Sequence, residues 1–258
     1  MPPATKFFLS LLTLTLPCLC DPIAVKFTEG TAHGFLAIRS TDGSIIASGD
    51  LTQTVRGDRV TSRVTFHFKD GSIDDETSVF TERKVFRLIT DYHIQKGPSY
   101  PKPADVLINA IKGTVTVRYE DKGVEKAETT RMNIPPDIAN GAIFDVIKNV
   151  PRDSETKLSW IAATPKPRLV KLVITAPDEE SFKIAGAPQK ATHFNIHIDI
   201  GGIAGFIAPF VGKQPDDINV WITGGDAPTF VKAQGPLYLG GPNWRIELES
   251  PAWPEASH

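Results

Sequence analysis

The sequence predicts a mainly β protein: a strongly curved antiparallel sheet, an incomplete barrel, wrapped around one central α-helix. Three observations lead to this prediction. The 20 Gly and 21 Pro among 258 residues are spread along the chain, which disfavours long helices. Most of the chain consists of short runs in which apolar and polar residues alternate, as in half-buried strands. One segment in the middle, residues 136–149, has instead the start signal and apolar surface of a helix.

The overall composition excludes two classes of protein. Hydrophobic residues make up 41% of the chain and charged residues 22%, so there is enough apolar surface to offset the chain entropy that folding removes. The formal net charge of −2 provides no basic surface for nucleic acid. We therefore expect a folded protein without a nucleic-acid partner.

The N-terminus has the features of an export signal. One positive charge, Lys6, precedes an apolar stretch over residues 7–16 that is too short to span a bilayer as a helix. Cys18 and Cys20 are small enough for the −3 and −1 positions of a signal-peptidase site. The sequence thus predicts a signal peptide over residues 1–20, with acylation of Cys20 or a retained anchor as the alternatives.

Cleavage after Cys20 would change the chemistry that is open to the protein. The mature chain, residues 21–258, would have 238 residues, no cysteine and a net charge of −3 because Lys6 is lost. Such a chain has no disulfide and no thiolate nucleophile or metal ligand. We expect it to form a single β-rich domain that is exported, periplasmic or associated with the outer envelope, with no membrane span after the leader.

The first set of strands is expected between Ala24 and Met132. Its runs are separated by Gly-containing turns spaced 8 to 14 residues apart, which predicts an antiparallel meander. Over residues 60–69, Val60, Val64 and Phe68 fall on one face together with two further residues, while the intervening residues are polar. One face of this strand should be buried and the other solvated.

The helix is expected over residues 136–149. Pro135, Pro136 and Asp137 suit a first helical turn, and Pro151 follows the expected end. Its apolar surface is broader than a narrow stripe, so we expect it to pack on the concave face of the sheet. A second set of strands follows. The expected strands are 157–163, 168–175, 191–200, 218–223, 229–234 and 244–249.

One group of polar residues could bind a metal. Alternation puts His193, His197 and Asp199 on one face of a strand, but a single strand cannot supply three ligands to one ion. A partner such as His33, His67 or His93 would have to come from another strand. The plainer interpretation is a solvated polar face, and we predict no metal and no cofactor.

A second group could carry acid/base chemistry. Asp91 and His93 share a strand face that Tyr92 opposes, and residues 74–76 form an acidic run. An acid/base pair or a calcium patch could be built from them, but the sequence contains no nucleophile elbow, phosphate loop or zinc-helix motif beside them. We therefore predict no catalytic residue here.

The segment Gly201–Gly212 has no polar side chain in its twelve residues, and it is too glycine-rich to make a good helix. It could be a buried crossing between strands or an apolar flap over a ligand. The flap and the central helix together provide the predicted ligand contacts. These are Ile143, Phe144, Ile147, Phe206, Ile207 and Phe210.

The C-terminal part of the chain carries a resemblance to known families. The run 218–232 contains Trp221, Asp226 and Pro228 and is followed by Gly235 and another strand. Together with the export leader, the meander and the mid-chain helix, this outline resembles uncharacterised bacterial exported families allied to the lipoprotein-carrier half-barrels. The resemblance implies a curved incomplete barrel whose concave side holds helices and sometimes lipid, and it brings no catalytic residue.

The function expected from the sequence is a non-enzymatic binding or carrier protein for an apolar ligand, a lipid or acyl chain, in the cell envelope. Burial of each methylene group would contribute about 0.8 kcal/mol to capture. One alternative is an envelope scaffold that binds another protein by a strand edge or by the flap. A metal-dependent or acid/base hydrolase is the more distant alternative.

Overall fold

The computed structural model describes residues 22–184, 187–200 and 214–249. Its strands are β1 (Ala32–Arg39), β2 (Ile45–Arg56), β3 (Arg59–Phe68), β4 (Ile73–Glu82), β5 (Phe86–Lys96), β6 (Ala104–Asn109), β7 (Thr114–Asp121), β8 (Val124–Arg131), β9 (Thr156–Ala162), β10 (Arg168–Ile184), β11 (Ala187–Asp199), β12 (Ile218–Thr223), β13 (Phe230–Pro236) and β14 (Asn243–Glu249). Its helices are α1 (Ile143–Val146) and the 3-10 turn η1 (Ile147–Asn149). The predicted signal peptide, residues 1–20, and the whole Gly201–Gly212 segment lie outside the described residues.

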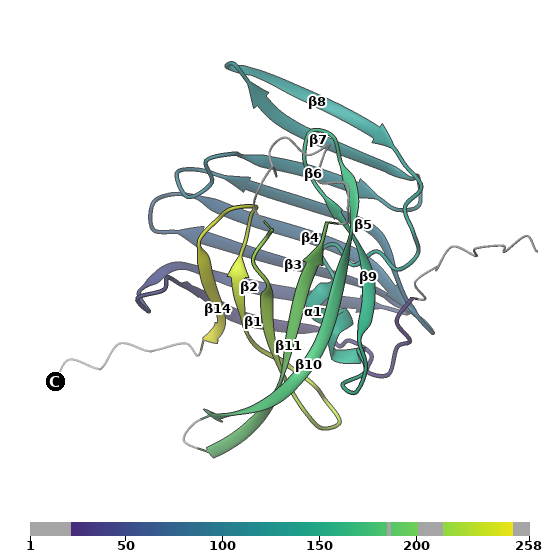
Figure 1. Ribbon diagram of the computed structural model, residues 1–258, viewed down its shortest axis with the longest axis vertical. Coiled ribbons are helices and arrows are strands. Elements are labelled where there is room, and N and C mark those ends of the chain that lie inside the picture. The colour runs from purple at the N-terminus through teal and green to yellow at the C-terminus, as the bar shows by residue number, and fades with distance from the viewer. Residues whose placement is uncertain (1–21, 185–186, 201–213, 250–258) are drawn as a thin grey trace, which may run out of the picture.

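All fourteen strands belong to one antiparallel sheet. Strands β1 to β8 form one meander and β9 to β14 a second, and pairing of β1 with β14 joins the two. The sheet is not closed, because β8 and β9 are its two edges. Figure 1 shows the strands β9 to β11 crossing in front of β1 to β4, with α1 between them. The prediction of a mainly β protein with an antiparallel sheet is confirmed.

Alternation along each strand determines which side chains are enclosed. On β3, Val60, Ser62, Phe66 and Phe68 are buried, as the period-two pattern predicts. Strand β12 has the predicted bounds, whereas β10 continues nine residues beyond the predicted end at Thr175 and pairs there with β11. No helix in the described ranges combines the length and hydropathy needed to cross a bilayer.

The helix is much shorter than predicted: α1 has 4 residues and η1 has 3, where residues 136–149 were expected to be helical. The backbone of Asp137 and Ala139 bonds instead to Ser159 on the edge strand β9, at 3.3 and 3.1 Å. The Asn140 side chain donates a hydrogen bond to the backbone oxygen of Ile161 on the same strand and accepts one from its N–H. Gly141, with φ of 64°, then breaks the helical path. The segment therefore covers a sheet edge, which satisfies backbone groups that a free edge would expose.

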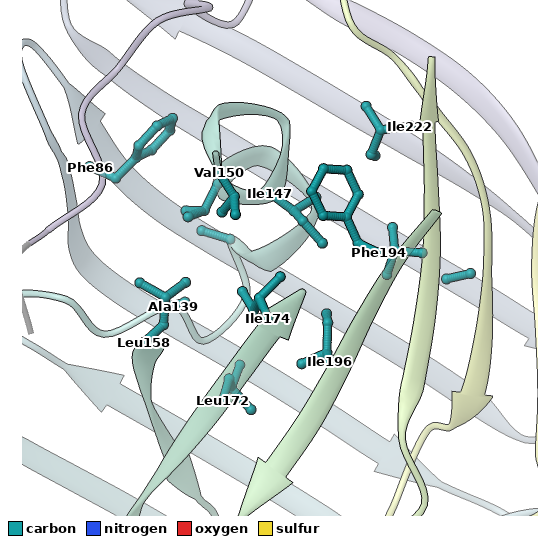
Figure 2. Packing of buried hydrophobic residues seen from close by; sticks show 14 of the residues in the cluster. Phe86, Ala139, Ile147, Val150, Leu158, Leu172, Ile174, Phe194, Ile196 and Ile222 are labelled. Carbon is teal, nitrogen blue, oxygen red and sulfur yellow. The ribbon is translucent and has the colours of Figure 1, made fainter. Parts of the chain in front are cut away.

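The largest hydrophobic core lies between the two meanders. Ile147 and Val150 pack there against Ile174 and Phe194 of the second meander (Figure 2). Val60 and Phe80 of the first meander belong to the same cluster. The short helix thus fills the space between facing parts of the sheet, and its side chains are part of the core.

Candidate functional site

A row of polar side chains interrupts the apolar interior on the enclosed face of the first meander. The residues at the two ends of this face belong to separate clusters: Val60 and Phe80 pack around the helix, whereas Phe66 and Phe68 pack around Trp244. Polar residues lie between the two clusters on β3, β4 and β5. We name them the polar belt: Ser62, Asp74, Glu76, Ser78, Asp91, His93 and Gln95.

The strand register brings the polar belt together. On β4 and β5, Asp74 lies opposite Gln95, Glu76 opposite His93, and Ser78 opposite Asp91. Residues directly opposite each other on antiparallel strands have Cβ atoms about 5 Å apart, so these side chains form one continuous group. Three carboxyl groups and one imidazole are therefore collected on a face from which most of the solvent is excluded.

Asp74 holds His93 in a fixed orientation. One carboxylate oxygen lies 2.8 Å from His93 Nε2, and the other accepts hydrogen bonds from Tyr100 Oη at 2.7 Å and Gln95 Nε2 at 2.9 Å. Burial alone would raise the pKa of Asp74, but these hydrogen bonds and the charge of His93 lower the pKa below its usual value. Asp74 is consequently an ionised carboxylate with every contact satisfied.

The proline-containing loop between β5 and β6 supplies one of these contacts. Tyr100, at 2% exposure, comes from this loop and packs edge-on against Phe68 and Trp244. Gln95 also donates to the backbone oxygen of Leu237, 142 residues further along the chain, at 3.0 Å. The orientation of His93 thus depends on a loop and a C-terminal segment that are distant from it in sequence.

The carboxyl groups keep His93 protonated at neutral pH. Burial would lower the pKa of His93, but Glu76, Asp74 and Asp91 outweigh it and raise the pKa to about 10. An imidazole with such a pKa is a poor general base near pH 7. Asp91 and His93 do share a face, as predicted, but this protonation state argues against the acid/base pair considered from the sequence.

Glu76, Ser78 and Asp91 lack hydrogen-bond partners within the described part of the chain. Ser78 and Asp91 are only 1% and 2% exposed, and Ser78 Oγ and Asp91 Oδ1 have no hydrogen-bond partner among the described residues. The Glu76 carboxylate is 3.7 Å from His93 Nδ1, beyond hydrogen-bonding distance. Burial raises the pKa of both Glu76 and Asp91, that of Asp91 well above its usual value. Native proteins rarely leave buried polar groups unpaired, so each of these groups requires an explanation.

Gly141 closes one side of the polar belt. A Cβ atom at this position would meet Asp91 Oδ1 and would lie 2.8 Å from Ser78 Cβ. The side chains of Glu76 and His93 remain 29% and 26% exposed, so the belt is accessible from their side. Leu51 and Val64, on the neighbouring strands, are apolar residues that are only partly covered there.

A second buried charge network ties the helix to the N-terminal segment. Lys148 Nζ lies 2.8 and 2.9 Å from the two carboxylate oxygens of Glu29, and 3.5 Å from Asp145. Gln53 also donates to Glu29 at 2.8 Å, and the Glu82 carboxylate accepts the Glu29 backbone N–H at 2.9 Å. Burial raises the pKa of Asp145 to about 7, against the opposing effect of Lys148. These contacts are satisfied, which indicates a structural role.

The predicted ligand contacts on the helix belong to the core. Ile147 is fully buried, and Ile143 and Phe144 are partly buried residues packed against the same cluster. The Phe144 ring lies 5.1 Å from the ring of Phe230 on β13. The other three predicted contacts, Phe206, Ile207 and Phe210, lie outside the described residues.

The polar face of β11 is engaged in local contacts. His193 Nδ1 lies 2.8 Å from Asp178, and the ring stacks on Trp221 with centroids 4.6 Å apart. His197 Nδ1 lies 2.8 Å from Asp217. In the part of the chain that the structure describes, no three His, Cys, Asp or Glu residues are placed to hold a metal ion.

Sequence reasoning missed Glu76 and Ser78. It treated residues 74–76 as one acidic run, whereas alternation on β4 separates them. Asp74 and Glu76 face inward, while Asp75 faces outward and pairs with Arg63 at 2.6 Å. The signal that could have found the belt is the coincidence of inward-facing carboxyl groups on two consecutive predicted strands.

Comparison with known proteins gave no match, either to a protein-family model or to a curated protein sequence. The functional conclusion therefore depends on the geometry of the chain itself.

Proposed function

We propose that the protein is an exported binding or carrier protein for an amphipathic ligand with an apolar chain, such as a lipid or acyl chain, in the cell envelope. The ligand would lie on the enclosed face of an incomplete barrel curved around the short helix, as in the lipoprotein-carrier half-barrels that the sequence resembles. The observation that carries the proposal is the polar belt, which separates the two apolar clusters. There Leu51 and Val64 remain partly uncovered next to Glu76 and His93.

The physical argument is that this arrangement does not serve stability alone. An interior filled by apolar side chains would be at least as stable as one that buries carboxyl groups without partners. A face with partly covered apolar residues beside unpaired polar groups suits a ligand that has both an apolar and a polar part. Phe144 and Phe230 are partly buried aromatic residues that could contact its apolar part.

Native mass spectrometry of the mature chain, purified from the periplasm, tests this proposal. We expect a bound acyl-chain ligand that organic solvent extracts and that a Val64→Trp variant no longer retains. Thr65→Trp is the matched control, because Thr65 faces the opposite side of the same strand. A folded wild-type protein that carries no such ligand, and takes up no alkyl chain when one is added, would contradict the proposal.

The edge strand β8 supports the alternative scaffold function less strongly than the polar belt supports the binding function. Seven of the eight residues of β8 are exposed, and this edge strand pairs with β7 alone. Its side chains include Glu125, Lys126, Glu128 and Arg131. Charged residues on an edge strand are a common protection against pairing with another chain, so β8 has the composition of a protected edge.

A further inference from the structure

We infer that the polar belt binds a primary ammonium group, with the Glu76 carboxylate as its main contact and Ser78 and Asp91 as further acceptors. This inference rests on the proposed function, because it identifies the polar part of the ligand whose apolar part would lie beside Leu51 and Val64. It follows from the balance of hydrogen-bond donors and acceptors on the enclosed face.

Acceptors exceed donors in the belt. Asp74 uses the available donors, since Tyr100, Gln95 and His93 all point to its two oxygens. No described residue donates a hydrogen bond to Glu76, Ser78 or Asp91. Ser78 has its own O–H, and burial favours the protonated form of Asp91, so Glu76 is the group that most requires an outside donor. An ammonium group provides three donors and no acceptor.

The positions of the three groups suit a compact cation. Ser78 is directly opposite Asp91 on the neighbouring strand, and Glu76 is the next residue on the same face of β4. Nearest and diagonal neighbours on such a face are about 5 to 8 Å apart, so a nitrogen bound at the partly exposed Glu76 carboxylate would lie beside Ser78 and Asp91. Gly141 closes the far side, which leaves the approach past Glu76.

The charge of the belt also favours a cation. Three carboxyl groups face one imidazole, and the imidazole is already held by Asp74 at 2.8 Å. A carboxylate ligand would meet Glu76 and Asp91 at close range, whereas an ammonium ion would meet unpaired carboxyl oxygens. A metal ion fits less well, because no three of these side chains converge as ligands in the described residues.

The test uses isothermal titration calorimetry with four molecules that share an octyl chain: octylamine, 1-octanol, octanoate and octyltrimethylammonium. We expect octylamine to bind wild-type mature protein at least about tenfold more tightly than 1-octanol, as one charge-assisted hydrogen bond would provide. Octyltrimethylammonium has the same charge but no N–H donor, and it should lose this advantage. Equal binding of octylamine and 1-octanol, or preference for octanoate, would overturn the inference.

Two variants locate the effect. Glu76→Gln should abolish the preference for octylamine, and Ser78→Ala should reduce it. Asp75→Asn is the matched control, since Asp75 is adjacent in sequence but faces outward to Arg63. A preference that survives Glu76→Gln in a folded protein would place the ammonium group elsewhere and overturn the assignment.

The failure of the proposed function can be told apart from the failure of this inference. If 1-octanol and the other octyl compounds do not bind, the apolar-ligand function fails. Titration with ethylamine, followed through the NMR signals of the His93 ring, then decides the inference alone. A saturable shift that Glu76→Gln removes would support an ammonium site, and the absence of any shift at millimolar ethylamine would reject it.

Discussion

Two buried charge networks within the described residues have a similar composition, but they differ in how completely their groups are paired. Each has three carboxyl groups and one cation: Glu29, Glu82 and Asp145 with Lys148, and Asp74, Glu76 and Asp91 with His93. In the Lys148 network, the two glutamates accept close hydrogen bonds and Asp145 lies 3.5 Å from the ammonium. In the polar belt, only Asp74 is fully satisfied. Similar groups thus connect two segments in one place, whereas in the other Glu76 and Asp91 accept no hydrogen bond from a described residue.

Removal of the cation from the paired network should have the largest effect. Lys148→Ala leaves Glu29 and Asp145 buried without their counter-ion, so we expect a loss of about 3–5 kcal/mol in the free energy of unfolding. Urea denaturation measures this loss. Lys190→Ala, at a lysine whose side chain is 73% exposed, is the control and should change stability by less than about 1 kcal/mol. A small effect of Lys148→Ala would mean that the network does not contribute as its contacts indicate.

Substitution of Gly141, which closes the polar belt, should have the next largest effect on stability. Gly141→Ala adds a Cβ atom that meets Asp91 and Ser78 and also requires an unfavourable positive φ, so we expect a loss of about 2–4 kcal/mol. Gly57 has the same φ of 64°, but a Cβ atom added there would meet nothing within 4 Å, so Gly57→Ala should lose only about 1 kcal/mol. Thermal and urea unfolding of both variants compare the two sites. Equal losses would show that the contact with the belt is unimportant.

The protonation of His93 should produce a pH dependence of about 2 kcal/mol. Its pKa is about 10 in the folded protein, above the unfolded value of about 6.5. The stabilisation is therefore complete below about pH 6.5 and is lost as the pH rises through about 10. The imidazole is a quarter exposed, so we expect less than the full shift would give. The difference in unfolding free energy between wild type and His93→Gln should shrink from pH 6 to pH 10. An NMR titration midpoint for His93 near 6.5 would contradict this expectation.

Loss of the unpaired carboxylate should have the smallest effect on stability. Glu76→Gln removes a carboxylate whose nearest described cation, His93 Nδ1, lies 3.7 Å away, so we expect a change within about 1 kcal/mol, of either sign. It should nevertheless lower the pKa of His93, because Glu76 is one of the charges that raise it. The NMR titration of His93 measures this change, with Asp75→Asn as control. If Glu76→Gln lowered the free energy of unfolding as much as Lys148→Ala, the two networks would contribute equally to stability and the polar belt would have a structural role.

The sequence predicted much of the fold and part of the site. Alternation identified the enclosed face of β3 and the shared face of Asp91 and His93, since both follow from the two-residue period of a strand. The predicted helix is longer than the observed one. The backbone groups around Ile138 form hydrogen bonds with β9 rather than within a helical turn. The start signals of a helix are local, whereas the competing edge strand is supplied by the tertiary fold.

The sequence by itself determined the class of the fold, the first meander with a second set of strands, and the side of several strands on which a residue lies. These features depend on local spacing and on turn-forming glycines. Only the tertiary structure decided which carboxyl groups find partners. Gln95 reaches Leu237 across 142 residues and Lys148 reaches Glu29 across 119, whereas Glu76 finds no donor in the described chain. Burial and pairing depend on which residues the fold places opposite a side chain. The alternation of residues within one strand does not predict these distant partners.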